Sequence, residues 1–248
     1  MEKITSRRNT LAAHIKKLGA DRSYRLQSKE FYCDGVKLLE EAVKSGAEVV
    51  AVLTSAHIAF PLPLETRVYQ TTRDIIDSLS PLKNAQDTVF TCKLPQHSSI
   101  EHTAKTGILL DGIQDPGNLG TIIRTADAFS IDSVILTGNC ADLYNPKTIR
   151  ATMGTVFRQK TYNMDISELL ALKKSGFKFI GASSGIGCKT IQNTALNDAI
   201  IAIGSEAHGL SQEVLALCGE TFTIPTAPHS ESLNAAIAAA IIIWESKK

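Results

Sequence analysis

Three polar segments that lie far apart in the chain contain the side chains most able to do chemistry. One carries an amide and a guanidinium, the second a carboxylate, and the third a hydroxyl and another amide. Such groups are typical of a polar ligand site if the fold brings the three segments together. The side chains in question belong to Asn118, Arg124, Glu206, Ser232 and Asn234.

The first segment predicts a strand, a tight turn and a helix in succession. Residues 107–110 form a short apolar run suited to a buried strand, Pro116-Gly117 fits the centre of a type II turn, and Asn118 can cap the helix that follows. Arg124 would then lie about a turn and a half inside that helix. The alternative is an ordinary strand-turn-helix in which Arg124 pairs with Asp127.

The second segment, residues 201–211, follows another apolar run. Gly204 would let a ligand approach the backbone, and Glu206 places a carboxylate just beyond the predicted strand end. Alternatively, Glu206 simply joins the start of the next helix, for which Ser211 is the predicted N-cap before residues 212–217.

The third segment, residues 224–234, runs directly into an apolar helix predicted over residues 235–244. Ser230 or Ser232 is expected to cap this helix, so that a hydroxyl and Asn234 face the same space. Helix N-termini bind carboxylates and phosphates readily. The Ala- and Ile-rich helix body is expected to pack closely, either within the chain or across a dimer interface.

The elements that must position these segments form two units. Strands predicted over residues 107–111, 133–137, 177–182, 199–204 and 221–224 alternate with helical stretches, which indicates a parallel sheet covered by helices. In such sheets ligands bind beyond the carboxyl ends of the strands. Before residue 93 a smaller α/β unit is predicted, with helices and strands over residues 9–18, 34–44, 48–53, 67–70, 72–79 and 88–92.

The charge is distributed unevenly along the chain. Residues 1–30 contain eight Lys or Arg and three acidic residues, whereas the rest contains 18 Lys or Arg and 22 acidic residues. A basic end suits a phosphate-bearing partner such as nucleic acid. A solvated basic helix is the alternative.

Several classes of protein are not indicated. The longest purely apolar run, residues 235–244, is shorter than the roughly 18 residues expected of a membrane span. The first 20 residues are polar and basic rather than leader-like. The five cysteines are dispersed without a CxxC pair, and no histidines have metal-ligand spacing. We therefore expect a cytoplasmic protein with no membrane partner and no metal site.

Together the three segments resemble the motif set of the SpoU family, also called the TrmH family, of RNA ribose 2′-O-methyltransferases in the knotted SPOUT class. Residues 145–147 and 150–154, which lie between the first two motifs, also resemble the family pattern. The motifs read Asp115-Pro116-Gly117-Asn118-Leu119-Gly120-Thr121 with Arg124, Gly204-Ser205-Glu206 with Gly209-Leu210-Ser211, and Ile224-Pro225 with Glu231-Ser232-Leu233-Asn234.

The resemblance implies an α/β protein with two domains. Residues 1–93, with Cys33-Asp34-Gly35-Val36, look like an L30e-like RNA-binding domain. Residues 94–105 would be a linker, and residues 106–248 a SPOUT-type knotted parallel-sheet methyltransferase domain. The chain departs from the family pattern at Thr226 and Pro228, where Met and Gly are usual, and at Asp34, where Glu is usual.

The same resemblance implies methyl transfer from S-adenosylmethionine to a ribose 2′-hydroxyl in structured RNA by a homodimer. Arg124 would be the central catalytic residue, clamping a phosphate and stabilising the developing alkoxide, with direct base catalysis as a lesser alternative. Glu206 would orient that guanidinium, and Asn118, Ser232 and Asn234 would bond the ribose, the cofactor or the loops. The expected cofactor-binding residues are Gly204, Ile224, Leu233 and, from the preceding strand end, Ser183.

Alternative functions remain open from the residues alone. Gly181, Gly185 and Gly187 match a GxxxGxG nucleotide loop, but every tyrosine precedes this loop, whereas a dehydrogenase places its Tyr-x-x-x-Lys pair afterwards. An RNA-binding protein without activity is a second alternative. Within the enzyme class, 23S ribosomal RNA is favoured over transfer RNA because of the N-terminal unit.

Overall fold

The computed structural model describes residues 2–95, 100, 106–183, 188–227 and 232–248. By packing, the chain divides into two compact units. We call Met1–Gln96 with Asp142–Arg158 the N-terminal unit, and His97–Ala141 with Gln159–Lys248 the C-terminal unit. The predicted linker, residues 94–105, lies largely outside the described residues.

The N-terminal unit is built on one sheet. Among the described residues, five strands have the order β1-β4-β3-β5-β2, and β5 runs antiparallel to both of its neighbours. The elements of this unit are β1 (Glu2–Lys3), α1 (Thr10–Ala20), α2 (Arg22–Ser28), β2 (Glu30–Asp34), α3 (Val36–Lys44), β3 (Val49–Thr54), β4 (Arg67–Gln70), α4 (Arg73–Leu79), β5 (Thr88–Lys93), α6 (Pro146–Thr152) and the 3-10 turn η1 (Thr155–Phe157).

Local sequence explains how α1 begins and which face it buries. The Asn9 side chain accepts hydrogen bonds from the backbone N–H groups of Leu11 and Ala12, and so caps the helix. Ile15 and Leu18 then recur at helical spacing and are buried against the sheet in one apolar core. One face of this helix in the basic segment is therefore buried in the core, and its other face is exposed to solvent.

The C-terminal unit is a parallel sheet. Among the described residues, seven strands have the order β10-β12-β9-β11-β6-β7-β8, and every pair is parallel. The elements are β6 (Gly107–Asp111), α5 (Pro116–Ala128), β7 (Ser133–Thr137), β8 (Thr161–Asn163), α7 (Ile166–Lys174), β9 (Phe179–Ala182), β10 (Lys189–Thr190), η2 (Ile191–Asn193), β11 (Ile200–Gly204), α8 (Gln212–Leu217), β12 (Glu220–Thr223) and α9 (Ala235–Glu245).

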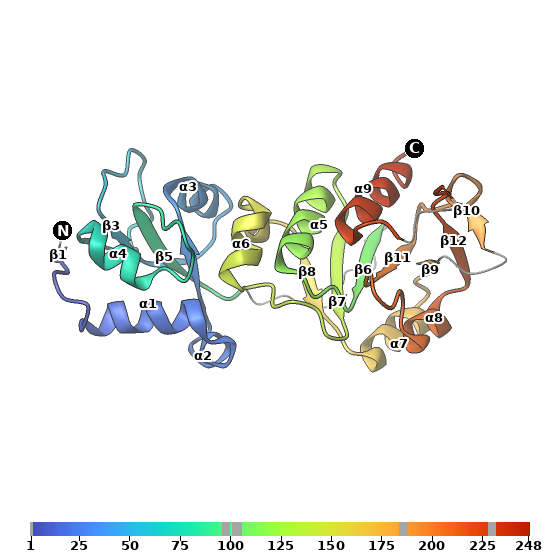
Figure 1. The fold of residues 1–248 in the computed structure, drawn as a ribbon, viewed down its shortest axis with the longest axis horizontal. Helices are drawn as coiled ribbons and strands as arrows, with labels where there is room; N and C mark the ends of the chain where they lie inside the picture. Colours follow the sequence, from blue (N-terminus) through green and yellow to red (C-terminus); the bar gives the residue numbers. More distant parts are fainter. Residues whose placement is uncertain (1, 96–99, 101–105, 184–187, 228–231) are drawn as a thin grey trace. The chain divides into compact units, whose positions relative to one another are not determined.

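Helices cover both faces of this sheet. Leu109 and Ile135 point to one face, where they share a core with Leu169 of α7 and Val214 of α8. The helices α5 and α9 lie side by side and cover the other face (Figure 1). Because β6 and β11 are central and covered twice, their residues are almost all buried, as expected for parallel strands.

The parallel α/β fold class is confirmed, and all five predicted strands of the C-terminal unit are present. The prediction missed α2 and β2, since residues 22–29 were expected only to lead into the helix predicted over residues 34–44. All five residues of β2 are buried, so the strand lacks the alternation that marks a half-exposed strand. Residues 142–158 pack in the N-terminal unit although their motif follows β7 in the chain.

Of the 23 elements in the described part of the chain, the two short edge strands of the C-terminal sheet were not predicted from the sequence. The strands β8 and β10 have three and two residues among those described, and both lie at the edges of the sheet. Strands of two or three residues are too short to show a periodic hydrophobic pattern.

None of the helices in the described part of the chain has the length and apolarity needed to cross a membrane.

Candidate active site

The turn between β6 and α5 differs from the predicted one. The helix begins at Pro116 instead of after a type II turn, and Asp115, not Asn118, is its N-cap, accepting a hydrogen bond from the backbone N–H of Asn118 at 2.7 Å. Proline fits the first position of a helix because its missing N–H would have no partner there. Asn118 is therefore released from capping, and its side chain can bond elsewhere.

Asp111, at the end of β6, anchors the second loop to the first. Its buried carboxylate accepts a hydrogen bond from the backbone N–H of Ser211 at 2.7 Å. Ser211 in turn caps α8, as predicted, by accepting a bond from the backbone N–H of Val214. The loop after β11 is thus held at both its ends beside the carboxyl end of β6.

Gly204 is required by the fold of the loop that follows it. A Cβ atom at this position would overlap the carbonyl group of Gly209, because residues 205–209 fold back on the strand end. Ser205 and Gly209 exchange two backbone hydrogen bonds at 2.9 and 3.1 Å, and Gly209 has a φ of 67°. A side chain at residue 204 would therefore displace this loop, and whether the Gly204 backbone also contacts a ligand stays a prediction.

The third loop also uses a different cap from the predicted one. Asn234 is the N-cap of α9, accepting bonds from the backbone N–H groups of Ala236 and Ile237 at 2.9 and 3.3 Å. Ser232 is exposed and lies two residues before the cap. Residues 228–231, including Pro228, His229, Ser230 and Glu231, lie outside the described residues.

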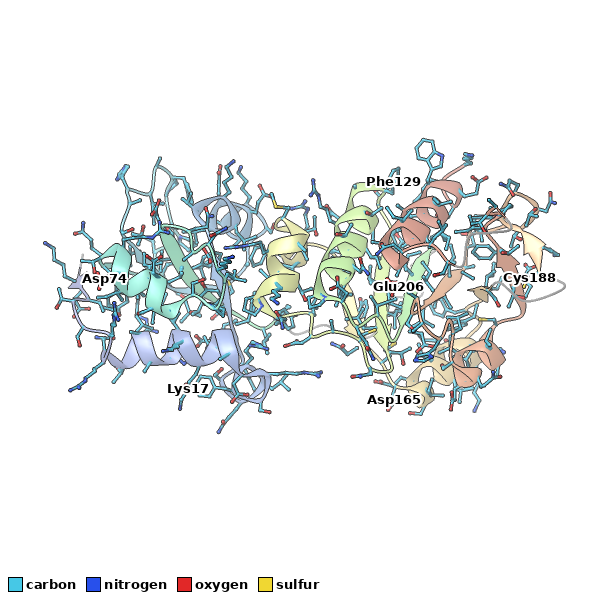
Figure 2. All side chains as sticks on the ribbon, viewed as in Figure 1. Lys17, Asp74, Phe129, Asp165, Cys188 and Glu206 are labelled. Carbon is cyan, nitrogen blue, oxygen red and sulfur yellow. The ribbon has the colours of Figure 1, made fainter. Side chains whose placement is uncertain are left out.

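The three loops meet through one hydrogen-bonded network, which we call the strand-end network. Asn118 donates to Glu206 Oε1 at 2.6 Å, and Asn234 donates to the side-chain oxygen of Asn118 at 3.1 Å. Glu206 Oε1 also accepts from the backbone N–H of Ala235 at 3.0 Å. Figure 2 shows Glu206 beside the start of α9. Its negative charge is favourable there because it faces the positive end of the helix dipole.

A cavity of about 530 Å³ opens beside this network. It is lined by all the expected cofactor-binding residues, Ser183, Gly204, Ile224 and Leu233, and also by Glu206 and Ser232. Three apolar side chains of the wall were not predicted from the sequence, because a phenylalanine inside a strand and apolar residues on a core helix look only like packing residues. The missed side chains are Phe222, Ala238 and Ile242.

Arg124 stands apart from the network. It is exposed on α5, and its guanidinium makes no hydrogen bond or ion pair with any residue that the structure describes. Glu206, which was expected to orient it, bonds to Asn118 and to α9 instead. The alternative pairing of Arg124 with Asp127 is likewise not seen among the described residues, so the guanidinium is available to a partner.

Within the described ranges, no group of three or more His, Cys, Asp or Glu is placed to hold a metal ion. Burial raises the pKa of the Cys140 thiol near the ends of β6 and β7, and raises that of Cys218 to about 11. Both thiols therefore stay protonated and poorly nucleophilic at neutral pH.

The glycine pattern that resembles a dehydrogenase loop has another explanation at its first position. Gly181 lies in β9, and a Cβ atom there would come within 3.0 Å of Leu210 and 3.1 Å of Cys218. Glycine at this position therefore permits close packing of the strand. Gly185 and Gly187 lie outside the described residues.

The chain is similar to a family model and to known proteins. Residues 105–244 match the model of the SpoU rRNA Methylase family. The chain is 31% identical over 247 residues to the 23S rRNA (guanosine(2553)-2'-O)-methyltransferase RlmP of Bacillus subtilis, with 98% of each chain covered.

Solved structures agree with this over nearly the whole chain. One is an AdoMet-bound rRNA methyltransferase from Sinorhizobium meliloti, at 26% identity and a TM-score of 0.87, covering 99% of this chain and 97% of that one. Another is the SpoU methyltransferase AviRb from Streptomyces viridochromogenes in complex with AdoMet, at 27% identity and a TM-score of 0.85, covering 97% of each chain.

Proposed function

This chain belongs to the SpoU rRNA methylase family, and from that premise we propose that it methylates a ribose 2′-hydroxyl of 23S ribosomal RNA in the cytoplasm. It is a methyltransferase that uses S-adenosylmethionine. The observation that carries the proposal is the meeting of Asn118, Glu206 and Asn234 beside one cavity. Three loops that are far apart in the chain converge there.

The cavity fits the cofactor by size and by chemistry. Its volume of about 530 Å³ lies in the range of pockets that bury a molecule of this size. Phe222, Leu233 and Ile242 supply apolar walls, while Ser183, Glu206 and Ser232 add polar residues to the lining. When bound, S-adenosylmethionine supplies an electrophilic methyl group on a sulfonium centre.

The strand-end network has the task of holding these loops still. Asn234 and Glu206 fix the first turn of α9, and Asn118 links both to α5. In-line transfer of a methyl group needs donor and acceptor atoms to be positioned closely, and rigid loops supply that positioning. We assign Asn118, Glu206 and Asn234 to positioning, and Ser232, exposed at the cavity, to direct contact with the ribose or the cofactor.

Arg124 is assigned to the RNA. A guanidinium is normally protonated at neutral pH, so it is suited to clamping a phosphate and to stabilising negative charge on the ribose oxygen. Its exposure and its lack of a partner among the described residues leave its donors available for this role. Accepting a proton from the hydroxyl is the lesser alternative, because the guanidinium has no basic lone pair while protonated.

Ribosomal RNA is favoured as the substrate because similarity to RlmP extends over the N-terminal unit as well as the motifs. We assign the N-terminal unit to RNA binding. The basic residues of α1 and of the segment before it give that unit a surface for phosphates.

A homodimer is part of the proposal. Ile237, Ile241 and Trp244 form an apolar stripe on α9 and are 54%, 36% and 56% exposed. Their spacing of four and three residues places them on one side of the helix, whereas Ala239 and Ile242 face the core. A second copy of the chain would cover the stripe, and Ile237→Asp is then expected to give monomers in sedimentation experiments.

Methyl transfer to separated RNAs tests the function. Ribosomal and transfer RNA from a strain lacking the protein would be incubated with labelled S-adenosylmethionine, and the labelled ribose would then be mapped. Label in 23S rRNA at a 2′-oxygen is the expected result. Label in transfer RNA would overturn the substrate, and tight RNA binding without any label would indicate a binding protein without activity.

A further inference from the structure

The N-terminal unit contains a second cavity, of about 700 Å³, that plays no part in the active site described above. It lies between the start of α3, the loop that precedes β5, and α6 with the residue that follows it. All its walls belong to the same packing unit, so the cavity is a property of that unit. The wall residues that matter for the argument are Val36, Lys37, Asn84, Gln86, Arg150 and Met153.

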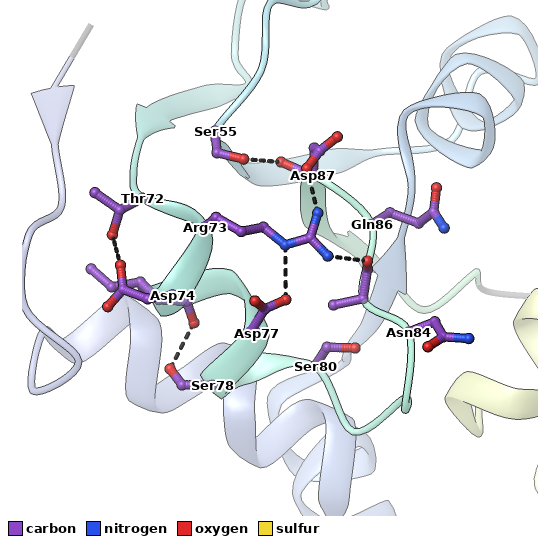
Figure 3. Close-up of polar contacts among 12 residues, drawn as sticks. Ser55, Thr72, Arg73, Asp74, Asp77, Ser78, Ser80, Asn84, Gln86 and Asp87 are labelled. Carbon is purple, nitrogen blue, oxygen red and sulfur yellow. Dashed lines mark hydrogen bonds and ion pairs between the residues drawn. The ribbon is translucent and has the colours of Figure 1, made fainter.

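Two carboxamides are presented to this cavity. Asn84 and Gln86 are exposed, and their side-chain amides make no hydrogen bond with any other described residue. Figure 3 shows both amide ends on the same side of the loop, pointing away from Arg73. A carboxamide has a donor and an acceptor side by side, which matches the edge of a nucleobase.

The loop that carries these amides is held from behind. Arg73 bonds to Asp77 at 2.9 Å, to Asp87 at 2.5 Å and to the carbonyl of Ala85 at 2.7 Å (Figure 3). The backbone N–H of Gln86 also donates to Asp34 at 2.9 Å. The amides therefore project from a fixed backbone, which lowers the entropy that binding would cost.

Arg150 provides a fixed planar surface at the same cavity. One of its nitrogens, Nη2, donates to Asp34 at 3.0 Å and to the carbonyl of Asn84 at 2.9 Å, and its side chain is 39% exposed. A guanidinium plane held in this way can stack on a base. Met153 and Val36 are 57% and 39% exposed and add apolar contact area.

The charges around the cavity suit an RNA strand. The acidic wall residues are already compensated, since Glu40 pairs with Lys44 and Glu41 pairs with Arg158. Lys37 is exposed at the rim and has no partner among the described residues. It can therefore meet a phosphate next to a base that has entered the cavity.

We propose that this cavity binds one unstacked nucleobase of the RNA substrate, with Arg150 and Met153 against its face and Asn84 and Gln86 on its edge. The proposal rests on the proposed function, because it assumes that RNA is the substrate. Sequence-selective recognition of RNA generally uses unpaired bases in this way. The N-terminal unit would then select an unpaired base as well as bind phosphates.

Binding measurements on the full chain test the proposal. The double variant Asn84→Ala/Gln86→Ala would be compared with wild type and with Gln27→Ala, an exposed glutamine of α2 that does not line the cavity. The probes are an RNA hairpin with a single-stranded loop from the labelled rRNA region and a fully paired duplex of equal length. We expect the double variant to bind the hairpin on the order of ten-fold more weakly. Its affinity for the duplex and for S-adenosylmethionine should not change.

Equal affinity of wild type and double variant for the hairpin would overturn the proposal. So would an equal loss for hairpin and duplex, which would indicate phosphate contact alone, or a change in oligomeric state, which would indicate that a second copy occupies the cavity. Crosslinking with 4-thiouridine in the loop provides a second readout, with peptides containing residues 84–86 or 150–153 as the expected products. If wild-type protein transfers no methyl group to any RNA, the proposed function fails first, whatever the hairpin result.

Discussion

Two carboxylates, Asp34 in the N-terminal unit and Glu206 in the C-terminal unit, each organise several hydrogen-bond donors in very different surroundings. Asp34 is buried and accepts from Tyr32, Ser80, Gln86 and Arg150. Glu206 is exposed and accepts from Asn118 and from the backbone of Ala235. A buried charge must be compensated to remain in the core, whereas an exposed one is stabilised by water as well.

The difference indicates what each group does for the protein. Asp34 joins β2, the loop before β5 and α6, so it holds together segments that are more than one hundred residues apart in the chain. Ion pairs from Arg25 to Asp142 and from Arg158 to Glu41 reinforce the same attachment. We infer that Asp34 contributes mainly to stability. Holding the exposed Glu206 carboxylate costs little free energy because water also stabilises its charge, and under the proposed function it acts mainly by positioning the active-site loops.

The largest expected effect is a loss of methyl-transfer activity, and it comes from an exposed residue of the C-terminal unit, Arg124. Arg124→Ala should reduce kcat/KM for methyl transfer by about 10²–10⁴-fold, because it removes a charged donor from the transition state. The melting temperature should stay within about 1 °C of wild type, since an exposed side chain without a described partner contributes little to folding.

Lys174→Ala is the matched control for Arg124→Ala, because Lys174 is an exposed cation at the end of α7. Its turnover should equal that of wild type. Should Arg124→Ala also keep wild-type turnover with intact RNA binding, the catalytic assignment of Arg124 fails.

Asp34→Ala should be the most destabilising change. It leaves the Arg150 charge and the buried Tyr32 hydroxyl without their acceptor, which costs about 3–5 kcal/mol of unfolding free energy, less some compensation because Arg150 is partly exposed. The melting temperature should fall by roughly 10 °C.

Asp74→Ala provides the contrast for Asp34→Ala. Asp74 forms an ion pair with Arg7 at 3.4 Å, and both side chains are more than 60% exposed. Removing it should lower the free energy of unfolding far less than Asp34→Ala does, because the exposed pair is screened by water and salt. Equal losses for the two variants in chemical denaturation would contradict the contrast between buried and exposed carboxylates.

Variants of Glu206 test the exposed carboxylate of this comparison. Glu206→Ala should lower kcat about 10–100-fold by releasing Asn118 and the first turn of α9, with a loss of stability of only about 1 kcal/mol. Glu206→Gln keeps an acceptor oxygen and should retain most of the activity. If Glu206→Gln is as slow as Glu206→Ala, the charge itself is needed, which would restore the predicted role of orienting Arg124.

The smallest effect concerns acid stability. Burial opposes ionisation of Glu30, but hydrogen bonds from Lys93 and His14 outweigh it and lower the pKa of Glu30 below its usual value of 4.5. Because the folded state has the lower pKa, this carboxylate stabilises the fold at neutral pH and loses that contribution as the pH falls below about 4.5. Glu30→Gln should therefore flatten the decline in stability between about pH 5 and pH 3. An unchanged pH profile in denaturation experiments would contradict this.

Most of the C-terminal unit could be predicted because its signals are local. Apolar runs at β6, β7, β9, β11 and β12 specify buried strands, and the motif residues follow those strands directly in the chain. The caps were harder to predict. Asp115, Asn118, Ser232 and Asn234 all have side chains that can cap, and the choice among them depends on where the neighbouring loops lie.

The sequence by itself therefore determined the five longer strands of the C-terminal unit and their alternation with helices, the polar residues at three strand ends and the basic N-terminal segment. Only the tertiary structure decided that Asn118 bonds to Glu206 and Asn234, that Gly204 makes room for Gly209, and that residues 142–158 pack in the N-terminal unit. The physical reason is the separation along the chain over which each feature is decided. Strand and helix periodicity arises from neighbouring residues, whereas these contacts join residues whose chemistry is compatible with several partners until the packed fold selects one.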